Sequence, residues 1–259
     1  MKRIIIICAC VVFAAVLVFF GTKVLAPTPE NPTLTSTAPD HFTVDYYEDF
    51  GYILTTPKNA TENMPLIVYL HSSSGKGSDP NKLLQLPGFP KSHVFGELQR
   101  IDAYVLIPQL PADEAGWERV KPELIRLIDK VAADCKADTT RISLTGHSMG
   151  ATGAWKLAAS YPEKFSCLVP ICGSIANLPV NHDALKNMPI WAITSNADTV
   201  VPPSYTTEFM DALQLINSSC SVTVLDGVTH EDAWQVYKAT NPSVFEWMLA
   251  QQAKNTADP

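Results

Sequence analysis

The residues best suited to chemistry in this chain form the pentapeptide Gly146-His147-Ser148-Met149-Gly150. This G-x-S-x-G pattern follows an apolar, strand-like segment at 142–145 and precedes a helical pattern at 149–160. A serine between a strand and a helix lies on a tight, strained turn, where flanking glycines leave room and the hydroxyl projects from the sheet. The helix N-terminus adds partial positive charge. The pattern therefore predicts Ser148 as a nucleophile.

Two histidines follow Ser148 and are candidates for the base that a serine hydroxyl requires. His230 comes shortly after a strand-like segment at 222–225, which would bring it to the carboxyl edge of the sheet. His182 lies in a polar stretch and is interpreted as a surface residue. We therefore predict His230 as the general base.

The base needs an acid that orients its ring. Asp198 follows the strand-like segment 190–194, and the order serine, acid, histidine is the one expected with this motif. Asp226 and Asp232 are nearer to His230, but an acid so close in sequence would struggle to reach Nδ1 of the ring from the correct side. Asp198 is the predicted acid.

An oxyanion requires two backbone N–H donors held in place beforehand. The amide of Met149, directly after the nucleophile, is one candidate. The small residues of the loop 71–77, after the strand-like segment 66–71, suggest the second, and we predict the amide of Ser73.

Strand-like and helical patterns alternate from about Phe42 onward, which is typical of a mostly parallel sheet covered by helices on both faces. Short right-handed crossovers favour a doubly wound α/β sheet, with its ligand site beyond the carboxyl ends of the strands. The predicted strands are 52–55, 66–71, 104–108, 142–145, 168–171, 190–194 and 222–225, and the predicted helices are 123–133, 149–160, 205–216 and 243–252.

Over roughly residues 64–249 the chain resembles the esterase and "predicted peptidase" branch of the α/β-hydrolases, near the dienelactone hydrolase, phospholipase/carboxylesterase and feruloyl esterase-like groups. Besides the nucleophile motif, the resemblance includes Leu70-His71, Ile107-Pro108-Gln109, Trp117, Tyr161-Pro162, Pro170-Ile171-Cys172-Gly173, Trp234 and Trp247. It implies the α/β-hydrolase fold, the triad of Ser148, Asp198 and His230, an oxyanion amide at Ser73 and no cofactor. It also implies that Trp117 and Trp234 lie near the active-site mouth, and we add His147 to these as a predicted substrate-binding residue.

Three positions depart from the family pattern. Ser72 replaces the glycine of the oxyanion loop. Ala151 occupies the small-residue position after the nucleophile motif, where glycine is common, and Ser195-Asn196 replaces a His-Gly pair before the acid. Ser72 matters most, because its Cβ could tilt the loop and misplace the Ser73 amide. Losing one such donor costs about 10²- to 10³-fold in rate.

Charge and cysteine content exclude two classes of site. Lys2, Arg3 and Lys23 are the only charges in the first 26 residues, so the net charge of −7 for the whole chain becomes −10 for the remainder. Such an acidic chain is a poor partner for nucleic acid. A zinc site has little support, because the cysteines beyond the first 26 residues form no C-x-x-C pattern or His/Cys cluster with metal-ligand spacing. Whether these four are paired stays open: Cys135, Cys167, Cys172 and Cys220.

The first 26 residues read as a targeting segment, with Lys2 and Arg3 before an apolar run at 4–20. We expect an uncleaved membrane anchor with the domain outside the cytoplasm, or a secreted protein if cleavage occurs after Ala26. Residues 27–41 are interpreted as a Pro/Thr-rich tether, 42–253 as one hydrolase domain and 254–259 as a disordered tail.

The residues together predict a serine esterase that works through an acyl-enzyme on a small-molecule, glycan or lipid ester, with contact to the membrane only through the N-terminal segment. A serine peptidase is the second interpretation. A catalytically silent hydrolase fold that acts as a surface binding protein is the third, and Ser72 motivates it. The sequence does not identify the natural ester.

Overall fold

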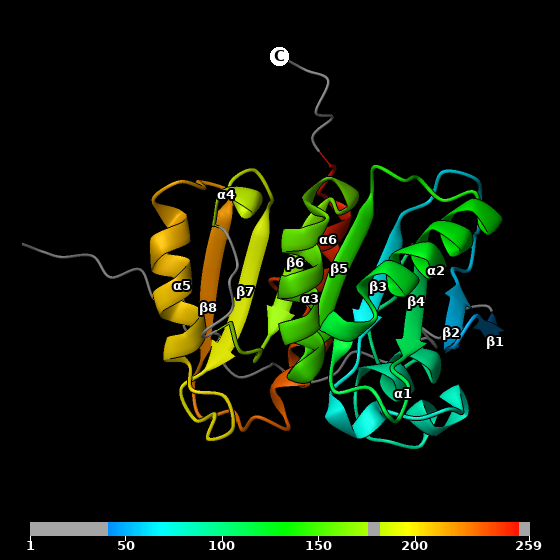
Figure 1. The fold of residues 1–259 in the computed structure, drawn as a ribbon, viewed down its shortest axis with the longest axis horizontal. Coiled ribbons are helices and arrows are strands. Elements are labelled where there is room, and N and C mark those ends of the chain that lie inside the picture. Colours follow the sequence, from blue (N-terminus) through cyan, green and yellow to red (C-terminus); the bar gives the residue numbers. More distant parts are fainter. Residues whose placement is uncertain (1–40, 176–181, 254–259) are drawn as a thin grey trace, which may run out of the picture.

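One eight-stranded sheet organises the part of the chain that the computed structural model describes, residues 41–175 and 182–253. The strand order is β1-β2-β4-β3-β5-β6-β7-β8 (Figure 1). β1 and β2 are antiparallel to their neighbours, and all the other pairs are parallel. The strands are β1 (His41–Tyr47), β2 (Phe50–Thr56), β3 (Leu66–Leu70), β4 (Tyr104–Gln109), β5 (Ile142–His147), β6 (Cys167–Ile171), β7 (Ile190–Ser195) and β8 (Cys220–Leu225).

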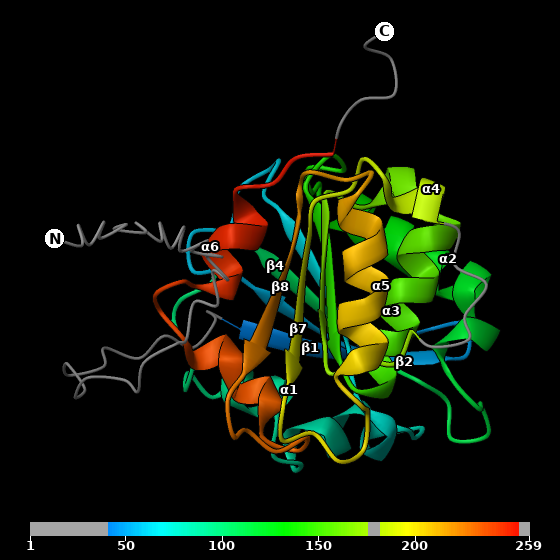
Figure 2. The same ribbon diagram turned by 90° about the vertical axis from the view of Figure 1, so that its left-hand side faces the viewer.

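Helices cover both faces of this sheet (Figure 2). One face carries α2 (Lys121–Asp134), α3 (Met149–Ser160), α4 (His182–Leu185) and α5 (Ser204–Gln214). The other face carries α6 (Val244–Leu249), with α1 (Phe89–Val94) and the 3₁₀ helix Ala233–Lys238 packed in the same apolar cluster. The predicted mostly parallel α/β sheet is confirmed.

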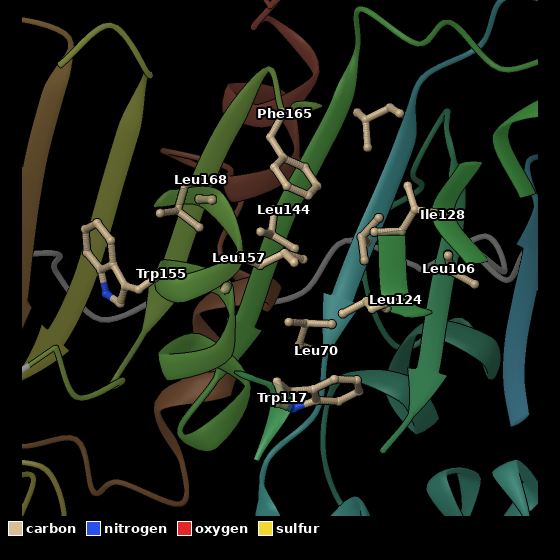
Figure 3. Close-up of a cluster of buried hydrophobic side chains, with 14 of the residues drawn as sticks. Leu70, Leu106, Trp117, Leu124, Ile128, Leu144, Trp155, Leu157, Phe165 and Leu168 are labelled. Carbon is tan, nitrogen blue, oxygen red and sulfur yellow. The ribbon is translucent and has the colours of Figure 1, made fainter. Parts of the chain in front are cut away.

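The pleat of the central strands explains why there are two cores rather than one. Successive side chains of a strand point to opposite faces, and in β3 Leu66, Val68 and Leu70 join the cluster under α2 and α3, while Ile67 and Tyr69 join the cluster under α1 and α6. Figure 3 shows part of the first cluster, in which Leu70, Leu144 and Leu168 come from three strands of the sheet. Burial on both faces holds the carboxyl ends of β3, β5, β6 and β7 rigidly side by side.

All seven predicted strands are present, and β1 is one that the sequence prediction missed. Its side chains are mostly exposed, so it lacks the apolar run that marks the buried strands. It begins at His41, the last residue of the predicted tether. The final helix is shorter than predicted and ends at Leu249.

The predicted membrane segment, most of the tether and the predicted tail lie outside the described residues. Within residues 41–175 and 182–253, no helix combines the length and the apolar character that crossing a bilayer requires.

Candidate active site

Ser148 stands on a strained turn between β5 and α3. Its φ is 57° and ψ is −121°, in a region that non-glycine residues rarely occupy. The two flanking glycines explain how the turn fits. A Cβ on Gly146 would lie 2.7 Å from the Leu70 carbonyl oxygen, and one on Gly150 only 1.9 Å from the same atom. Close packing of the turn against β3 therefore requires glycine at both positions.

His230 and Asp198 meet Ser148 at the carboxyl edge of the sheet. Nε2 of His230 lies 2.8 Å from Oγ of Ser148, and Nδ1 lies 2.7 Å from Oδ2 of Asp198. Asp198 and His230 are buried, and Ser148 is half-buried. The structure thus brings together the three residues that the sequence singled out, although 50 and 32 positions separate them along the chain.

The carboxylate of Asp198 is fixed on both oxygens. Oδ1 accepts hydrogen bonds from the backbone N–H groups of Val200 (2.9 Å) and Val201 (2.8 Å), while Oδ2 faces His230. Burial by itself would raise the pKa of Asp198, but the hydrogen bonds from His230, Val201 and Val200 outweigh it, so this pKa lies below its ordinary value. The carboxylate is therefore ionised at neutral pH.

The competing residues have other partners. Asp226 accepts from Nδ2 of Asn196 at 2.7 Å, and Asp232 accepts from Thr229 and Gln235. His182 is half-buried at the start of α4, where its ring stacks on Phe209 at 4.3 Å between centroids. The prediction of a surface position for His182 is therefore only partly correct.

The dipeptide Ser195-Asn196, one of the departures from the family pattern, ties the acid loop to the loop that carries His230. Oγ of Ser195 donates to the Val228 carbonyl. Asn196 donates to Asp226 and accepts from the N–H of Gly227 at 2.9 Å. These two residues depart from the family pattern, and the structure gives them a bridging position between the two loops.

The predicted oxyanion amides are both at helical N-termini. Met149 is the first residue of α3, and Ser73 is the first residue of a 3₁₀ turn, Ser73–Gly75. The first N–H groups of a helix have no partner within that helix, so both amides are free of intrahelical bonds. Ser72 to Ser74 and Ser148 border one pocket.

His71 fixes the loop that carries Ser73. Its Nε2 accepts the N–H of Leu110 at 3.0 Å, so Nδ1 carries the proton and donates to the Ser72 carbonyl at 2.6 Å. Burial lowers the pKa of His71 to about 4, which keeps the ring neutral. The ring also lies where a Cβ on residue 75 would be, 2.5 Å from that position, so only glycine fits at 75.

Two of the departures fit without strain. Ser72 has φ −71° and ψ 174°, an extended conformation that any residue adopts, so its Cβ does not force the loop to tilt. The Cβ of Ala151 occupies the space above Gly173, where a second Cβ would approach it to 2.5 Å. A glycine at 173 thus compensates for alanine at 151.

The pocket beside Ser148 has a volume of about 590 Å³, within the range of small-molecule sites. One wall is apolar and comes mostly from the stretch 83–95, with Tyr69 added from β3. The opposite rim follows His230 and is polar, with Glu231, Asp232 and Gln235. The apolar wall comprises Tyr69, Leu83, Leu86, Pro87 and Pro90.

The three predicted substrate-binding residues lie in different places. Trp234 borders the pocket, and Nζ of Lys238 lies 5.0 Å from the centre of its ring. His147 also borders the pocket, but its Nε2 is 2.8 Å from the His230 carbonyl oxygen. Burial lowers the pKa of His147 to about 4, so the neutral ring donates from Nε2 to that oxygen.

Trp117 corrects the prediction of a residue at the mouth. It is almost fully buried in the core cluster with Leu70 and Leu124 (Figure 3), and its Nε1 donates to the His71 carbonyl at 3.1 Å. Its large apolar ring gains more from burial than from a rim position. Trp117 therefore packs against the start of the loop that carries Ser73, and it does not border the pocket.

All four cysteines of the described residues are free thiols. One of them, Cys172, lies with Asp198 and His230 in a buried group whose possible metal-ligand atoms are all within 4.8 Å of one another. No pattern in the sequence pointed to this group, because its members come from three separate strand ends.

A sheet of this order with a serine turn after β5 is the α/β-hydrolase fold. The dienelactone hydrolase family matches residues 103–241, more than half of the chain, so the chain belongs to that family. A comparison with curated protein sequences finds no match.

Solved structures with this fold include several esterases. A thermostable esterase is 24% identical with a TM-score of 0.66, over 82% of this chain and 64% of that one. The acetyl xylan esterase from Aspergillus awamori is 14% identical with a TM-score of 0.59, over 80% and 98%. Est1E from Butyrivibrio proteoclasticus is 16% identical with a TM-score of 0.55, over 81% and 97%. The chain spans less than two thirds of the thermostable esterase.

Proposed function

We propose that this protein is a serine esterase that cleaves carboxylic esters through an acyl-enzyme. The observation that carries the proposal is the continuous hydrogen-bonded line from Oγ of Ser148 through His230 to Asp198, with separations of 2.8 and 2.7 Å. Membership of the dienelactone hydrolase family supports the same assignment, as do structural neighbours that are named as esterases.

The chemistry follows from the proton positions. Oδ2 of Asp198 accepts the Nδ1 proton of His230, so Nε2 presents a lone pair to the Ser148 hydroxyl. As the Ser148 oxygen attacks the ester carbonyl carbon, its proton moves to Nε2, and the resulting imidazolium is stabilised by the ionised carboxylate. The negative oxygen that forms is assigned to the amides of Ser73 and Met149.

The intermediate then collapses, and His230 gives its proton to the departing alcohol oxygen. The acyl group stays on Ser148. A water molecule repeats the sequence: His230 removes its proton, the water oxygen attacks the acyl carbon, and the carboxylic acid leaves as Ser148 recovers its proton. The apolar wall of the pocket suits the acyl group, and its polar rim suits the alcohol.

The decisive experiment combines covalent labelling with turnover. Wild-type protein should react with a fluorophosphonate at Ser148, located by peptide mass spectrometry, and should hydrolyse p-nitrophenyl esters of short acyl chains. Ser148→Ala should lose both activities, whereas Ser72→Ala should keep both. A folded wild-type protein that neither reacts nor hydrolyses any ester would refute the proposal. Matched peptide substrates in the same assay distinguish an esterase from a peptidase.

The interpretation as a silent binding protein rested on Ser72. Because Ser72 has an ordinary extended conformation, that reason disappears. We also propose that the domain acts outside the cytoplasm, on the strength of Lys2, Arg3 and the apolar run at 4–20. Susceptibility of the full chain to protease added outside intact cells tests this, and full protection would contradict it.

A further inference from the structure

Cys172 has no part in the proposed mechanism, yet it lies beside two members of the triad. It directly follows β6, between the ends of β5 and β7, and is fully buried. Its φ is 50°, in the left-handed region, and its N–H donates to the Ile193 carbonyl at 2.8 Å. Such a conformation is strained in a residue with a side chain and persists only when the surrounding structure fixes it. The side chain is thus held in a definite place.

Three different ligand atoms converge at this place. Sγ of Cys172, a carboxylate oxygen of Asp198 and a ring nitrogen of His230 all lie within 4.8 Å of one another, and all three residues are buried. Thiolate, imidazole and carboxylate are the donors that Zn²⁺ binds in proteins, with three protein ligands and one open position as a recurrent arrangement. A thiolate also selects for softer cations over Mg²⁺ and Ca²⁺.

We propose that Cys172, Asp198 and His230 form a binding site for a soft divalent cation such as Zn²⁺, and that occupation of the site switches the triad off. A thiolate and a carboxylate together carry two negative charges, which balance the cation, so the occupied site is neutral. This matters because an unbalanced charge in a protein interior is strongly unfavourable.

The geometry requires only a small adjustment. Nδ1 of His230 and Oδ2 of Asp198 are 2.7 Å apart when they share a proton. Two ligands at about 2.1 Å from a tetrahedral Zn²⁺ are roughly 3.4 Å apart, so the two side chains would separate by less than about 1 Å.

The position of the proton on the His230 ring explains the inhibition, and this part of the proposal rests on the proposed function. In the metal-free protein Nδ1 of His230 carries the proton and Nε2 accepts from Ser148. A cation on Nδ1 displaces that proton, and the neutral ring then carries it on Nε2. Such a ring faces the Ser148 hydroxyl as a donor and is unable to take its proton. Cys172 releases its own proton to solvent as it becomes a thiolate.

Without a cation the thiol of Cys172 remains protonated and takes no part in the reaction. Burial, followed by the negative charge of Asp198, raises the pKa of the Cys172 thiol. A bound cation therefore replaces the proton on sulfur.

The test uses the full chain with four of its other thiols removed, in the variant Cys8→Ser, Cys10→Ser, Cys135→Ser, Cys220→Ser. Co²⁺ should bind with one ion per chain and give a near-ultraviolet thiolate-to-cobalt charge-transfer band. Zn²⁺ should displace it and suppress ester turnover and fluorophosphonate labelling in parallel, and EDTA should restore both.

Matched variants in the same background identify the ligand. Cys172→Ser, or Cys172→Ala if the first does not fold, should abolish the band and weaken Zn²⁺ binding at least tenfold. Cys167→Ser should change neither, because Cys167 is also buried but lies at the opposite end of β6, with Sγ 3.4 Å from Oγ of Ser143. A band that persists in both Cys172 variants, or no Co²⁺ binding at millimolar concentration, would overturn the proposal.

Binding and activity are measured separately, so the two proposals fail in different ways. Ser148→Ala should bind Co²⁺ with the same band as the parent. If the parent shows the band but hydrolyses no ester, the metal site stands and the esterase assignment fails. If the parent hydrolyses esters but Zn²⁺ binds without slowing turnover, the esterase stands and the switch is refuted.

Discussion

Asp198→Asn tests whether this side chain sets the proton positions of the triad. An asparagine at 198 has two orientations. In the first, its carbonyl oxygen remains at the Oδ1 position and accepts from Val200 and Val201, and its NH₂ group faces Nδ1 of His230. That NH₂ group is a donor, so Nδ1 must accept and the ring proton must move to Nε2. The ring then has no lone pair for Ser148.

The second orientation preserves the productive ring but is costly. The NH₂ group would face the N–H groups of Val200 and Val201, which leaves both donors without their carboxylate acceptor. Each unsatisfied group costs about 1–3 kcal/mol, or about 2–6 kcal/mol in all. At about 1.4 kcal/mol per tenfold, the productive ring is populated at roughly 3% down to 0.005%. Loss of the negative charge beside the imidazolium adds to this.

We therefore expect Asp198→Asn to lower kcat/KM for a short-chain p-nitrophenyl ester by about 10³- to 10⁴-fold. KM should change little, because Asp198 does not border the pocket. Asp226→Asn is the control, since Asp226 was the competing acid and is exposed; it should stay within about fivefold of wild type. A loss under about 30-fold in an Asp198→Asn protein with unchanged melting would refute the hydrogen-bond argument.

Three further outcomes follow. Gly150→Ala brings a Cβ to 1.9 Å from the Leu70 carbonyl oxygen and should lower the free energy of unfolding by about 3 kcal/mol. The control Gly227→Ala, at a position with φ 68° and open space around it, should lower it by only about 1–2 kcal/mol. Equal losses for the two variants in urea unfolding would argue against the steric reason. His147→Leu removes the donor to the His230 carbonyl and should reduce kcat/KM about 5- to 100-fold, while His147→Gln should recover part of it; identical rates for the two variants would exclude the hydrogen bond as the cause. Finally, burial lowers the pKa values of His71, His93 and His147 from 6.5 to about 4. Between pH 6.5 and pH 4 the unfolded chain therefore takes up protons that the native protein does not, and the free energy of unfolding should fall by roughly 3 kcal/mol for each histidine. Unfolding curves at pH 7 and pH 4.5 that coincide would contradict this.

The triad residues could be predicted because a parallel sheet converts sequence order into spatial position. The strands β5, β7 and β8 are recognisable from their apolar runs, and the chain leaves each of them at the same edge. Polar residues just after those runs, Ser148 and Asp198, and His230 a few positions later, must therefore be neighbours. The structure places them so, and their catalytic roles remain a prediction until they are tested.

Trp117 and Cys172 show what sequence reasoning misses. The family resemblance placed Trp117 near the mouth, but a tryptophan beside a functional loop can lie on either side of it, and here it packs beneath His71. Cys172 carries no signal at all, because a cysteine after an apolar strand resembles any small core residue. Only the positions of three strand ends relative to one another reveal that its sulfur lies beside Asp198.

Hydrogen bonds of the sheet continue one residue beyond the ends of β5 and β6, and they hold Ser148 and Cys172 in their strained conformations. The N–H of Ser148 donates to the Ile171 carbonyl at 2.9 Å, and the N–H of Cys172 donates to the Ile193 carbonyl at 2.8 Å. Each bond joins the residue that follows one strand to the next strand across, so each extends the parallel ladder by one position. Both residues have positive φ, 57° and 50°, which costs about 1–3 kcal/mol each. A ladder bond in a buried sheet offsets this cost only if the register of β5, β6 and β7 is fixed. The burial of both sheet faces, which makes the strands easy to recognise, therefore also keeps the serine in its strained position.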